Sequence, residues 1–293
     1  MSLEIKQLHP LFVGEVVGLD LARPLPAETI AELKQAIDHY AVLVFHDQHL
    51  DDETQLAFAR HFGPIEPPQA YSGRRRLRPE FADVSNLDPD NRPREAGDRR
   101  RMNQLGNRLW HTDASFRRVP GALSMLYAHR VPPASPLGDG DTEFAHMRAA
   151  YDALPDATKE RIEPLVAEHS IFASRAQIGF TEFTDEERAA MPAVPQRVVR
   201  RRPGSGRKTL YLASHASHIV GMPVPDGILL LRDLIEHATQ PQFVHRHRWH
   251  EGDLVIWDNR CTMHRGRPFD ESQTRDLRRI TTQDTASTLD QAA

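Results

Sequence analysis

The sequence of 293 residues contains only one cysteine, Cys261, so an internal disulfide is excluded and a reducing cytoplasm is indicated. No apolar run approaches the roughly 20 residues that a transmembrane helix needs. Residues 1–10 lack the basic and apolar parts of a secretion signal. Neither charge dominates, because 37 Lys and Arg against 41 Asp and Glu give a net charge of −4. These absences predict a cytoplasmic protein that binds neither nucleic acid nor membrane.

Familiar catalytic signatures are missing as well. The chain has no Gly-x-Ser-x-Gly nucleophile elbow and no dinucleotide-binding fingerprint. Residues 204–209, Gly-Ser-Gly-Arg-Lys-Thr, lack the spacing of a phosphate-binding loop and indicate a hairpin turn. Cys261 follows an apolar stretch and is typical of a small buried hydrophobe rather than a nucleophile.

The composition is that of a globular protein, with 39% hydrophobic and 27% charged residues. The length fits one large β-rich or mixed domain over 1–293. Hydrophobic spacing predicts a β-rich core surrounded by helices, whereas residues 166–196 give no clear pattern. Helices are expected at 26–40, from the cap Asp51 to Phe62, at 146–154, 157–165 and 227–237. Strands are expected within 11–21 and at 41–45, 81–85, 122–131, 141–144, 198–201, 208–213, 243–249, 253–257 and 278–282.

Residues 66–108 break this regular pattern. Two arginine runs, at 74–76 and 99–101, lie among Pro, Gly, Asp and Asn, with a single expected strand at 81–85. The segment is either a solvated loop or a lid whose basic side chains meet an anionic substrate, since long loops in compact domains are often binding elements. At the other end of the chain, residues 284–293 are expected to form a flexible tail.

Residues 109–116, Leu-Trp-His-Thr-Asp-Ala-Ser-Phe, contain a pattern suited to metal binding. In a strand, His111 and Asp113 point to the same face and offer one imidazole and one carboxylate. A further histidine completes the two-histidine, one-carboxylate set that suits non-haem Fe(II). Three groups can supply it and spacing does not choose among them: His264; the cluster His245, His247 and His250; or the pair His215 and His218.

Arg275 and Arg279 form the next candidate feature. An iron oxygenase that uses a 2-oxoacid must hold the far carboxylate of a dicarboxylate, and arginine provides the matching bidentate geometry. A hydroxyl such as that of Thr142 can add one hydrogen bond. The alternative is an exposed basic turn, which is the usual setting of closely spaced arginines.

Together these residues resemble the taurine dioxygenase family of Fe(II)/2-oxoglutarate-dependent oxygenases. That family has His-x-Asp, a distant His and an Arg about ten residues later, which here match His111, Asp113, His264 and Arg275. The resemblance extends over nearly the whole chain and is strongest to the 2,4-dichlorophenoxyacetate dioxygenase branch. Shared words include Gly-Asp-Thr-Glu-Phe (140–144), Met-Arg-Ala-Ala-Tyr-Asp-Ala-Leu (147–154), Ser-His-Ala-Ser-His (214–218) and Trp-Asp-Asn-Arg-Cys (257–261).

The resemblance implies a mixed α+β, mainly β fold with a double-stranded β-helix core, also called a jelly roll or cupin-like fold, with flanking helices and a long lid loop. It also implies the roles of the site residues. His111, Asp113 and His264 are expected to hold Fe(II) as the catalytic centre, and Thr142 and Arg275 to bind 2-oxoglutarate. The expected substrate-binding residues are Arg279, His215 and Asn107, with Tyr71 or Arg74 in place of a lysine that the phenoxyacetate branch has in the lid.

The activity implied is hydroxylation of a small organic acid with Fe(II), 2-oxoglutarate and O2, supported by ascorbate, with release of succinate and CO2. An aryloxyalkanoate hydroxylated beside its ether oxygen collapses to a phenol and a 2-oxoacid. Alternatives are a sulfonate or alkylsulfate dioxygenase and, more remotely, a metal-binding jelly-roll ligand sensor without turnover. The partner is therefore expected to be a small-molecule carboxylate, and the chain is expected to form a homo-oligomer, from dimer to tetramer.

Overall fold

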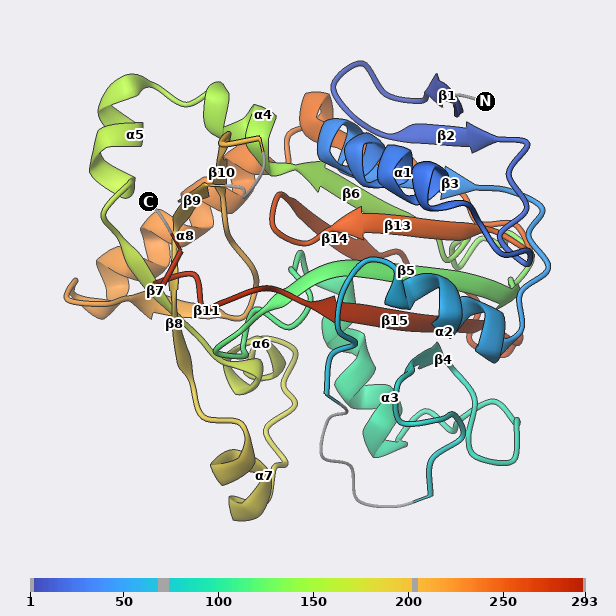
Figure 1. The fold of residues 1–293 in the computed structure, drawn as a ribbon. Coiled ribbons are helices and arrows are strands. Elements are labelled where there is room, and N and C mark those ends of the chain that lie inside the picture. The colour runs from blue at the N-terminus through green and yellow to red at the C-terminus, as the bar shows by residue number, and fades with distance from the viewer. Residues whose placement is uncertain (1–2, 68–73, 202–204, 292–293) are drawn as a thin grey trace.

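A computed structural model describes residues 3–67, 74–201 and 205–291 of the chain. Within these residues, a large seven-stranded sheet, two three-stranded sheets and one two-stranded sheet are flanked by helices (Figure 1). The fold is therefore mixed α+β with several sheets, as the sequence predicts. None of the helices in the described ranges is long and apolar enough to cross a membrane.

The large sheet is antiparallel except for one parallel pair, β2 with β3. Its strands lie in the order β1 (Glu4–Gln7), β2 (Gly14–Val17), β3 (Val42–Phe45), β13 (Leu254–Asp258), β5 (Gly121–Arg130), β15 (Asp276–Gln283) and β4 (Ala82–Ser85). The expected strands at 41–45, 81–85, 122–131, 253–257 and 278–282 all belong to it, within a few residues at either end.

Alternation of side chains gives this sheet two apolar faces. Leu43 and Phe45 pack on one side with residues of α1 (Ala27–Tyr40) and α2 (Asp52–Arg60), whereas Val42 and Val44 pack on the other. Helix α1 forms because Ile30, Leu33 and Ile37 repeat at helical spacing and are buried. Full burial of each such side chain is worth about 1.5–3 kcal/mol.

The start of α2 is fixed by Asp51, the cap expected from the sequence. Its side chain accepts a hydrogen bond from the Thr54 backbone N–H at 2.8 Å, and the Thr54 hydroxyl contacts the Asp51 backbone N–H at 2.9 Å. This capping box satisfies backbone donors that the first turn of a helix leaves unpaired. Helix α2 is thereby held against the outer face of the large sheet (Figure 1).

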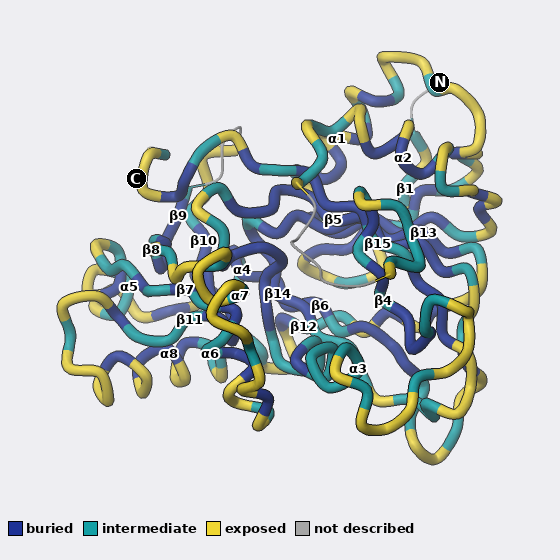
Figure 2. Tube along the Cα trace, turned by 90° about the horizontal axis from the view of Figure 1, so that it is seen from below, coloured by how far each residue is buried: buried dark blue, intermediate teal, exposed yellow. Residues whose placement is uncertain are grey.

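The second face of the large sheet packs on the three-stranded sheet, which has the order β12 (Val244–His247), β6 (Thr142–His146) and β14 (Thr262–Gly266). Phe144 on β6 contacts Trp257 on β13, with ring centroids 5.4 Å apart. Figure 2 shows β5 and β13 of the large sheet as mostly buried, with exposed residues on loops and outer helix faces, whereas β12 is only partly buried. The strand ends around this packed centre carry the site described below.

A second apolar cluster lies beyond the three-stranded sheet and includes Ala145, Met263, Leu231 and Leu234. It is built by α4 (Met147–Asp152), α5 (Asp156–Ile162), α8 (Val224–Ala238) and η2 (Pro241–Phe243) together with two small sheets. These sheets are β11 (Ala216–Ile219), β7 (Val166–His169) and β8 (Val194–Arg197), and the hairpin β9 (Val199–Arg201) with β10 (Lys208–Leu210). The remaining helices of residues 166–196 are α6 (Ile171–Ala176) and α7 (Asp185–Ala190).

Three expectations need correction. Residues 109–116 are not a strand: His111 makes an isolated bridge to His264, and the chain then turns, with Ala114 at a φ of 55°. The segment 66–108 is not simply a loop, because besides β4 it contains α3 (Arg99–Gln104) and η1 (Leu105–Arg108). The expected tail is packed in part, because the buried Asp284 pairs with Arg200 at 2.6 Å and Ser287 and Thr288 are buried.

Candidate metal centre and the cavities beside it

His111 and His264 are joined by two backbone hydrogen bonds. The N–H of each residue donates to the carbonyl of the other, at 2.9 and 2.8 Å, and the two rings lie 4.2 Å apart. Asp113 follows two residues after His111, and one ligand atom from each of the three residues lies within 4.8 Å of the others. All three are buried. The backbone bridge, rather than a shared strand face, therefore brings the histidine and aspartate ligands together.

The histidine nitrogens are arranged for metal binding. His111 Nδ1 donates to the Leu109 carbonyl at 2.8 Å, which leaves Nε2 with its lone pair. His264 Nε2 lies 3.7 Å from an Asp113 oxygen. Burial lowers the pKa of His111 and lowers that of His264 well below its usual value, so both rings are neutral, the form that coordinates a metal.

Asp113 is held as a carboxylate. Ser124 Oγ donates to Oδ2 at 2.7 Å, and the Arg279 guanidinium donates to Oδ1. Burial on its own raises the pKa of a carboxyl group, but the charge of Arg279 and the Ser124 hydrogen bond outweigh it and lower the pKa of Asp113. The three donors thus fit a divalent metal that favours imidazole and carboxylate, with coordination positions left open.

The rival histidines lie elsewhere. His245 packs against His9 and Phe12. His46, His250 and Asp253 form a second group with metal-ligand spacing, but the His250 side chain is 68% exposed. Both oxygens of Asp253 already have partners: His46 Nδ1 lies 2.7 Å and His247 Nε2 3.1 Å away, and the His250 backbone N–H donates at 2.9 Å. Burial and the adjoining cavities favour the group formed by His111, Asp113 and His264.

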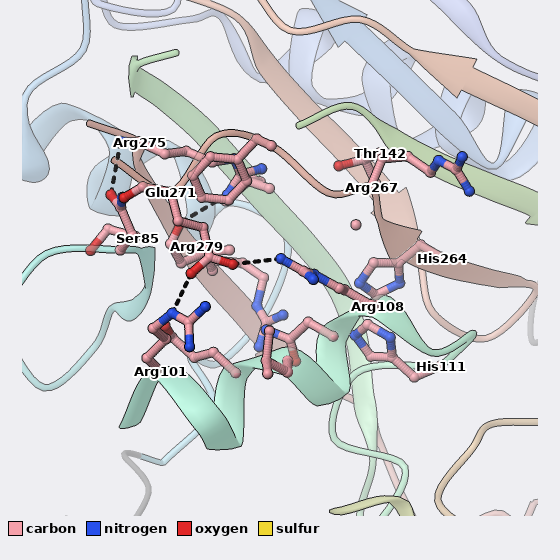
Figure 3. Close-up of a pocket in the computed structure, with 18 of the residues that line it drawn as sticks. Ser85, Arg101, Arg108, His111, Thr142, His264, Arg267, Glu271, Arg275 and Arg279 are labelled. Atoms are coloured by element: carbon pink, nitrogen blue, oxygen red, sulfur yellow. Dashed lines mark hydrogen bonds and ion pairs between the residues drawn. The ribbon is translucent and has the colours of Figure 1, made fainter. Parts of the chain in front are cut away.

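A small cavity of about 110 Å³ opens beside His111 and His264 (Figure 3). Thr142 and Arg275 both line it. The Thr142 hydroxyl oxygen accepts from Trp249 Nε1 at 2.9 Å, so its own proton remains available for a ligand oxygen. Arg275 donates to the carbonyls of Val84 and Gly140 at 3.0 and 3.3 Å, and burial lowers its pKa to about 10.

The mouth of this cavity is crossed by ion pairs. Glu271 pairs with Arg108 at 2.6 Å and with Arg101, as Figure 3 shows. Arg101 belongs to α3 and Arg108 to η1, whereas Glu271 lies in the loop between β14 and β15. Of the two arginine runs in 66–108, only Arg101 lines the small cavity, and Glu271 links it and Arg108 to the C-terminal part of the chain.

A larger cavity of about 480 Å³ adjoins the first and reaches Asp113. The two share Val84, Gln104, Asn107, His111 and Arg279. The larger cavity has apolar wall residues and charged ones. The apolar ones include Phe81, Phe116, Ile171, Phe183 and Met191, and the charged ones include Glu66, Arg175 and Arg279.

The other expected site residues divide into two sets. Asn107, His215 and Arg279 line the larger cavity, as expected of substrate-binding residues. Arg74 does not: its exposed side chain pairs with Asp90 at 2.8 Å and lines neither cavity. Tyr71 lies outside the described residues.

Four residues that contribute to the site were not expected from the sequence. Ser124 contacts Asp113, Trp249 contacts Thr142, and Asn259 accepts from the Asp113 backbone N–H at 3.2 Å. Arg175 lines the larger cavity. These residues reach the site only through the packing of distant strands and helices, so no local spacing indicates them; Asn259 alone lies in a word shared with the family.

Comparison with known proteins agrees with this geometry. Residues 4–281 match the family described as "Taurine catabolism dioxygenase TauD, TfdA family". The 2,4-dichlorophenoxyacetate dioxygenase of Cupriavidus pinatubonensis is 46% identical over 289 residues, which cover 98% of this chain and 99% of that one. The (S)-phenoxypropionate/alpha-ketoglutarate-dioxygenase of Sphingobium herbicidovorans is 37% identical over 282 residues, 94% of this chain and 92% of its own.

A solved structure, that of AAD-2 in complex with Mn(II) and N-oxalylglycine, superposes with a TM-score of 0.94 at 52% identity and covers 98% of this chain and all of that one. The chain therefore belongs to the TauD, TfdA family. It is an Fe(II)- and 2-oxoglutarate-dependent dioxygenase, as the resemblance of its motifs predicts.

Proposed function

We propose that this enzyme hydroxylates an aryloxyalkanoate, such as 2,4-dichlorophenoxyacetate, at the carbon beside the ether oxygen. One oxygen atom of O2 enters the substrate and the other enters succinate, formed from 2-oxoglutarate with loss of CO2. The hydroxylated product is a hemiacetal that collapses to a phenol and a 2-oxoacid. One observation carries this proposal: two cavities meet at the metal centre, one with a buried arginine suited to a dicarboxylate and a larger one whose walls combine aromatic and aliphatic side chains with arginines.

The metal centre is proposed to be His111, Asp113 and His264. Fe(II) bound there supplies the oxygen-activating chemistry. The chain contributes fixed ligand geometry, because Leu109 orients the His111 ring and Ser124 and Arg279 hold the two oxygens of Asp113. Such hydrogen bonds to ligands commonly change metal affinity or activity by 10–100-fold.

The small cavity is proposed to bind 2-oxoglutarate. Its far carboxylate is expected to pair with Arg275 and to accept a hydrogen bond from Thr142. Arg275 is suited to this role because its buried charge meets only carbonyl oxygens among the described residues within hydrogen-bond reach. Asp141 acts on Arg275 only at longer range, and a ligand carboxylate supplies a counter-charge in direct contact, in the bidentate geometry that arginine favours.

The larger cavity is proposed to bind the aryloxyalkanoate. Its ring is expected to lie among apolar residues such as Phe116 and Ile171, and its carboxylate to approach Arg279. Asn107 and His215 line the same space. Burial lowers the pKa of His215 well below its usual value, and its Nδ1 contacts Ser174 Oγ at 2.8 Å, so the ring is neutral and can accept or donate one hydrogen bond.

The finer description of the fold belongs to the same proposal. The pair of facing sheets, β12-β6-β14 against the large sheet, is consistent with a jelly-roll or double-stranded β-helix core. Residues 1–293 are proposed to form one catalytic domain, with 66–108 as the lid over the two cavities. The segment contributes Arg101 and Arg108 to one cavity wall and Asn103 to the other.

The decisive experiment is an assay of succinate and phenol release with Fe(II), ascorbate and 2-oxoglutarate. The panel contains phenoxyacetates, both enantiomers of a phenoxypropionate, taurine and an alkyl sulfate. We expect stoichiometric succinate and phenol from at least one aryloxyalkanoate and none from His111→Ala, which removes a metal ligand. Turnover of taurine or an alkyl sulfate alone contradicts the proposed substrate class. Full activity of His111→Ala contradicts the ligand set.

A further inference from the structure

Arg175 is a buried cation inside the larger cavity that the family motifs do not point to. It lies on α6 (Ile171–Ala176) and is only 7% exposed. Its guanidinium donates from Nε to Asn103 Oδ1 at 2.6 Å, from Nη1 to Ser174 Oγ at 3.1 Å and from Nη2 to Asn107 Oδ1 at 3.4 Å. All three acceptors are neutral, and the guanidinium has five N–H groups. Donors therefore remain for a further partner.

The positive charge of Arg175 has no negative partner among the described residues. Three other arginines with buried side chains do: Arg76 pairs with Asp83 and Asp276, Arg200 with Asp284 and Arg260 with Asp258. The fully buried Arg148 instead contacts His146 Nε2 and two backbone carbonyl oxygens, but it lines neither cavity. The stretches outside the description contain no Asp or Glu. A buried charge is costly unless it is paired. Because Arg175 also lines the larger cavity, an anion bound there can supply this partner.

Arg275 provides an internal comparison. Burial lowers the pKa of both Arg175 and Arg275 to about 10, which leaves both guanidinium groups charged at neutral pH. Each lines one of the two cavities that meet at His111, and each contacts only neutral oxygens. Arg275 is proposed to bind a carboxylate in the small cavity. By the same reasoning, Arg175 is suited to bind a carboxylate in the larger cavity.

The surroundings of Arg175 are shaped to accommodate its guanidinium. A Cβ placed on Gly106 falls 2.3 Å from Nη1 and 2.6 Å from Cζ, so only glycine leaves room for the group. Gly106 lies in η1 and does not have a positive φ among the backbone angles of the described chain, so its backbone conformation does not demand glycine. The missing side chain instead allows the guanidinium to lie against the backbone.

Arg175 is also connected to residues that border the metal centre. Ser174 Oγ contacts both Arg175 Nη1 and His215 Nδ1, and the His215 ring lies 6.0 Å from that of His111. Asn107, the other contact, lines both cavities. Arg279, by contrast, already shares its charge with Asp113. The uncompensated positive charge of the larger cavity is thus that of Arg175.

We propose that Arg175 is a second anion-binding residue of the larger cavity, which binds the substrate carboxylate from α6 while Arg279 approaches it from β15. This inference rests on the function proposed above for the choice of a carboxylate as the anion. It makes Arg175 a determinant of specificity for charged over neutral substrates, because a neutral analogue leaves the guanidinium unpaired.

The test is calorimetric titration of enzyme loaded anaerobically with Mn(II) and 2-oxoglutarate. The ligands are phenoxyacetate, its neutral amide phenoxyacetamide and an alkyl sulfate. We expect Arg175→Gln to weaken phenoxyacetate binding by at least 10-fold and phenoxyacetamide binding by less than 3-fold, with 2-oxoglutarate affinity unchanged. Arg99→Gln is the matched control, since Arg99 lines the same cavity but pairs with Glu187 at 2.7 Å; it should change neither ligand by more than 3-fold.

Gly106→Ala provides a second test that keeps the charge but displaces the guanidinium, so it should also weaken phenoxyacetate more than the amide. Arg175→Lys should bind phenoxyacetate with intermediate affinity. If Arg175→Gln loses affinity equally for phenoxyacetate and phenoxyacetamide, or for neither, the inference is overturned while the proposed substrate class stands. Binding of the alkyl sulfate alone, lost in Arg175→Gln, overturns the substrate class and leaves the anion site standing.

Discussion

Ser124 Oγ donates a hydrogen bond to Asp113 Oδ2 at 2.7 Å, from the face of β5 that points toward the metal centre. Both residues are buried. Asn259 Nδ2 in turn donates to Ser124 Oγ at 2.9 Å. The Asp113 carboxylate is thus the end of a hydrogen-bond chain that begins at Asn259, in the turn between β13 and β14. The orientation of a metal ligand is thereby set by residues that never touch the metal.

Removing this hydrogen bond should weaken metal binding. We expect Ser124→Ala to lower the affinity for Mn(II) or Fe(II) by about 10–100-fold, because Asp113 loses a partner that orients it. Thr281→Val is the control, since Thr281 Oγ1 contacts Ser124 at 3.1 Å and Asp113 makes no hydrogen bond to it. Calorimetric or EPR titration of metal measures the effect. Equal affinities of Ser124→Ala and wild type would show that Arg279 alone holds Asp113.

Arg275→Gln should weaken the binding of 2-oxoglutarate. Loss of one partner of a buried charge pair costs about 2 kcal/mol or more, so we expect the KM for 2-oxoglutarate to rise by about 30-fold or more. Steady-state kinetics with 2-oxoglutarate and with a 2-oxoacid lacking the far carboxylate measure it. The two co-substrates should become similar in the variant. Arg267→Gln, at the partly exposed rim of the same cavity, serves as control. An unchanged preference for 2-oxoglutarate would contradict the assigned role.

Arg279→Ala should act on the substrate and on the metal. We expect the KM for an aryloxyacetate to rise by about 10-fold or more, and by more than the KM for 2-oxoglutarate, because Arg279 is proposed to meet the substrate carboxylate whereas Arg275 is proposed to bind 2-oxoglutarate. Metal affinity should also fall, since Asp113 loses its charged partner. Kinetics at saturating iron separate the two effects. A larger rise for 2-oxoglutarate would reverse the roles of Arg275 and Arg279.

His169 predicts how stability depends on pH. Burial lowers the pKa of His169 to about 3, and its Nδ1 contacts Ser115 Oγ at 3.0 Å. The unfolded chain takes up this proton near pH 6.5 and the folded protein does not. The free energy of unfolding is therefore unaffected by the titration of His169 above pH 6.5. As the pH falls from 6.5 toward 3, protonation of this histidine in the unfolded chain lowers the free energy of unfolding by about 1.4 kcal/mol per pH unit.

Replacing this histidine should reduce the effect. We expect His169→Asn to lose about 1.4 kcal/mol less stability than wild type between pH 7.5 and pH 5.5, as measured by urea unfolding. The exposed His61 provides the control variant, His61→Asn. Parallel pH profiles for wild type and His169→Asn would mean that His169 is protonated in the folded protein.

The sequence predicts most of the regular elements because their hydrophobic spacing is local. Helix α1 and strand β3 agree with expectation within one residue, since Ile30, Leu33 and Ile37 repeat at helical spacing and 42–45 form a continuous apolar run. Helix α3 is missed because Arg99–Gln104 has no buried residue and hence no apolar face to detect. Its capping residue, Asp98, is the one local sign of it.

The site is predicted unevenly for a similar reason. His111, Asp113, His264, Thr142 and Arg275 lie within motifs, and the structure brings them to one cavity or its edge. The prediction that His111 and Asp113 point to the same face of one strand is wrong, because the chain turns at Ala114 instead of continuing as a strand. Arg175 and Ser124 act through contacts between segments far apart in the chain, which no single-sequence spacing encodes. The prediction that Arg74 binds substrate fails because the sequence does not specify the backbone path of this segment, and the side chain pairs with Asp90 away from both cavities.

The reciprocal backbone bridge of His111 and His264 links the two halves of the polypeptide where the metal binds. A bound ion on these two side chains and Asp113 closes a long loop of chain and so acts as a removable crosslink. Since any ligand that binds only the folded state stabilises it, the melting temperature should rise with the concentration of Mn(II) and fall back on chelation. The melting temperature measured by scanning calorimetry therefore reports the fraction of protein that holds the metal, and the measurement requires no substrate.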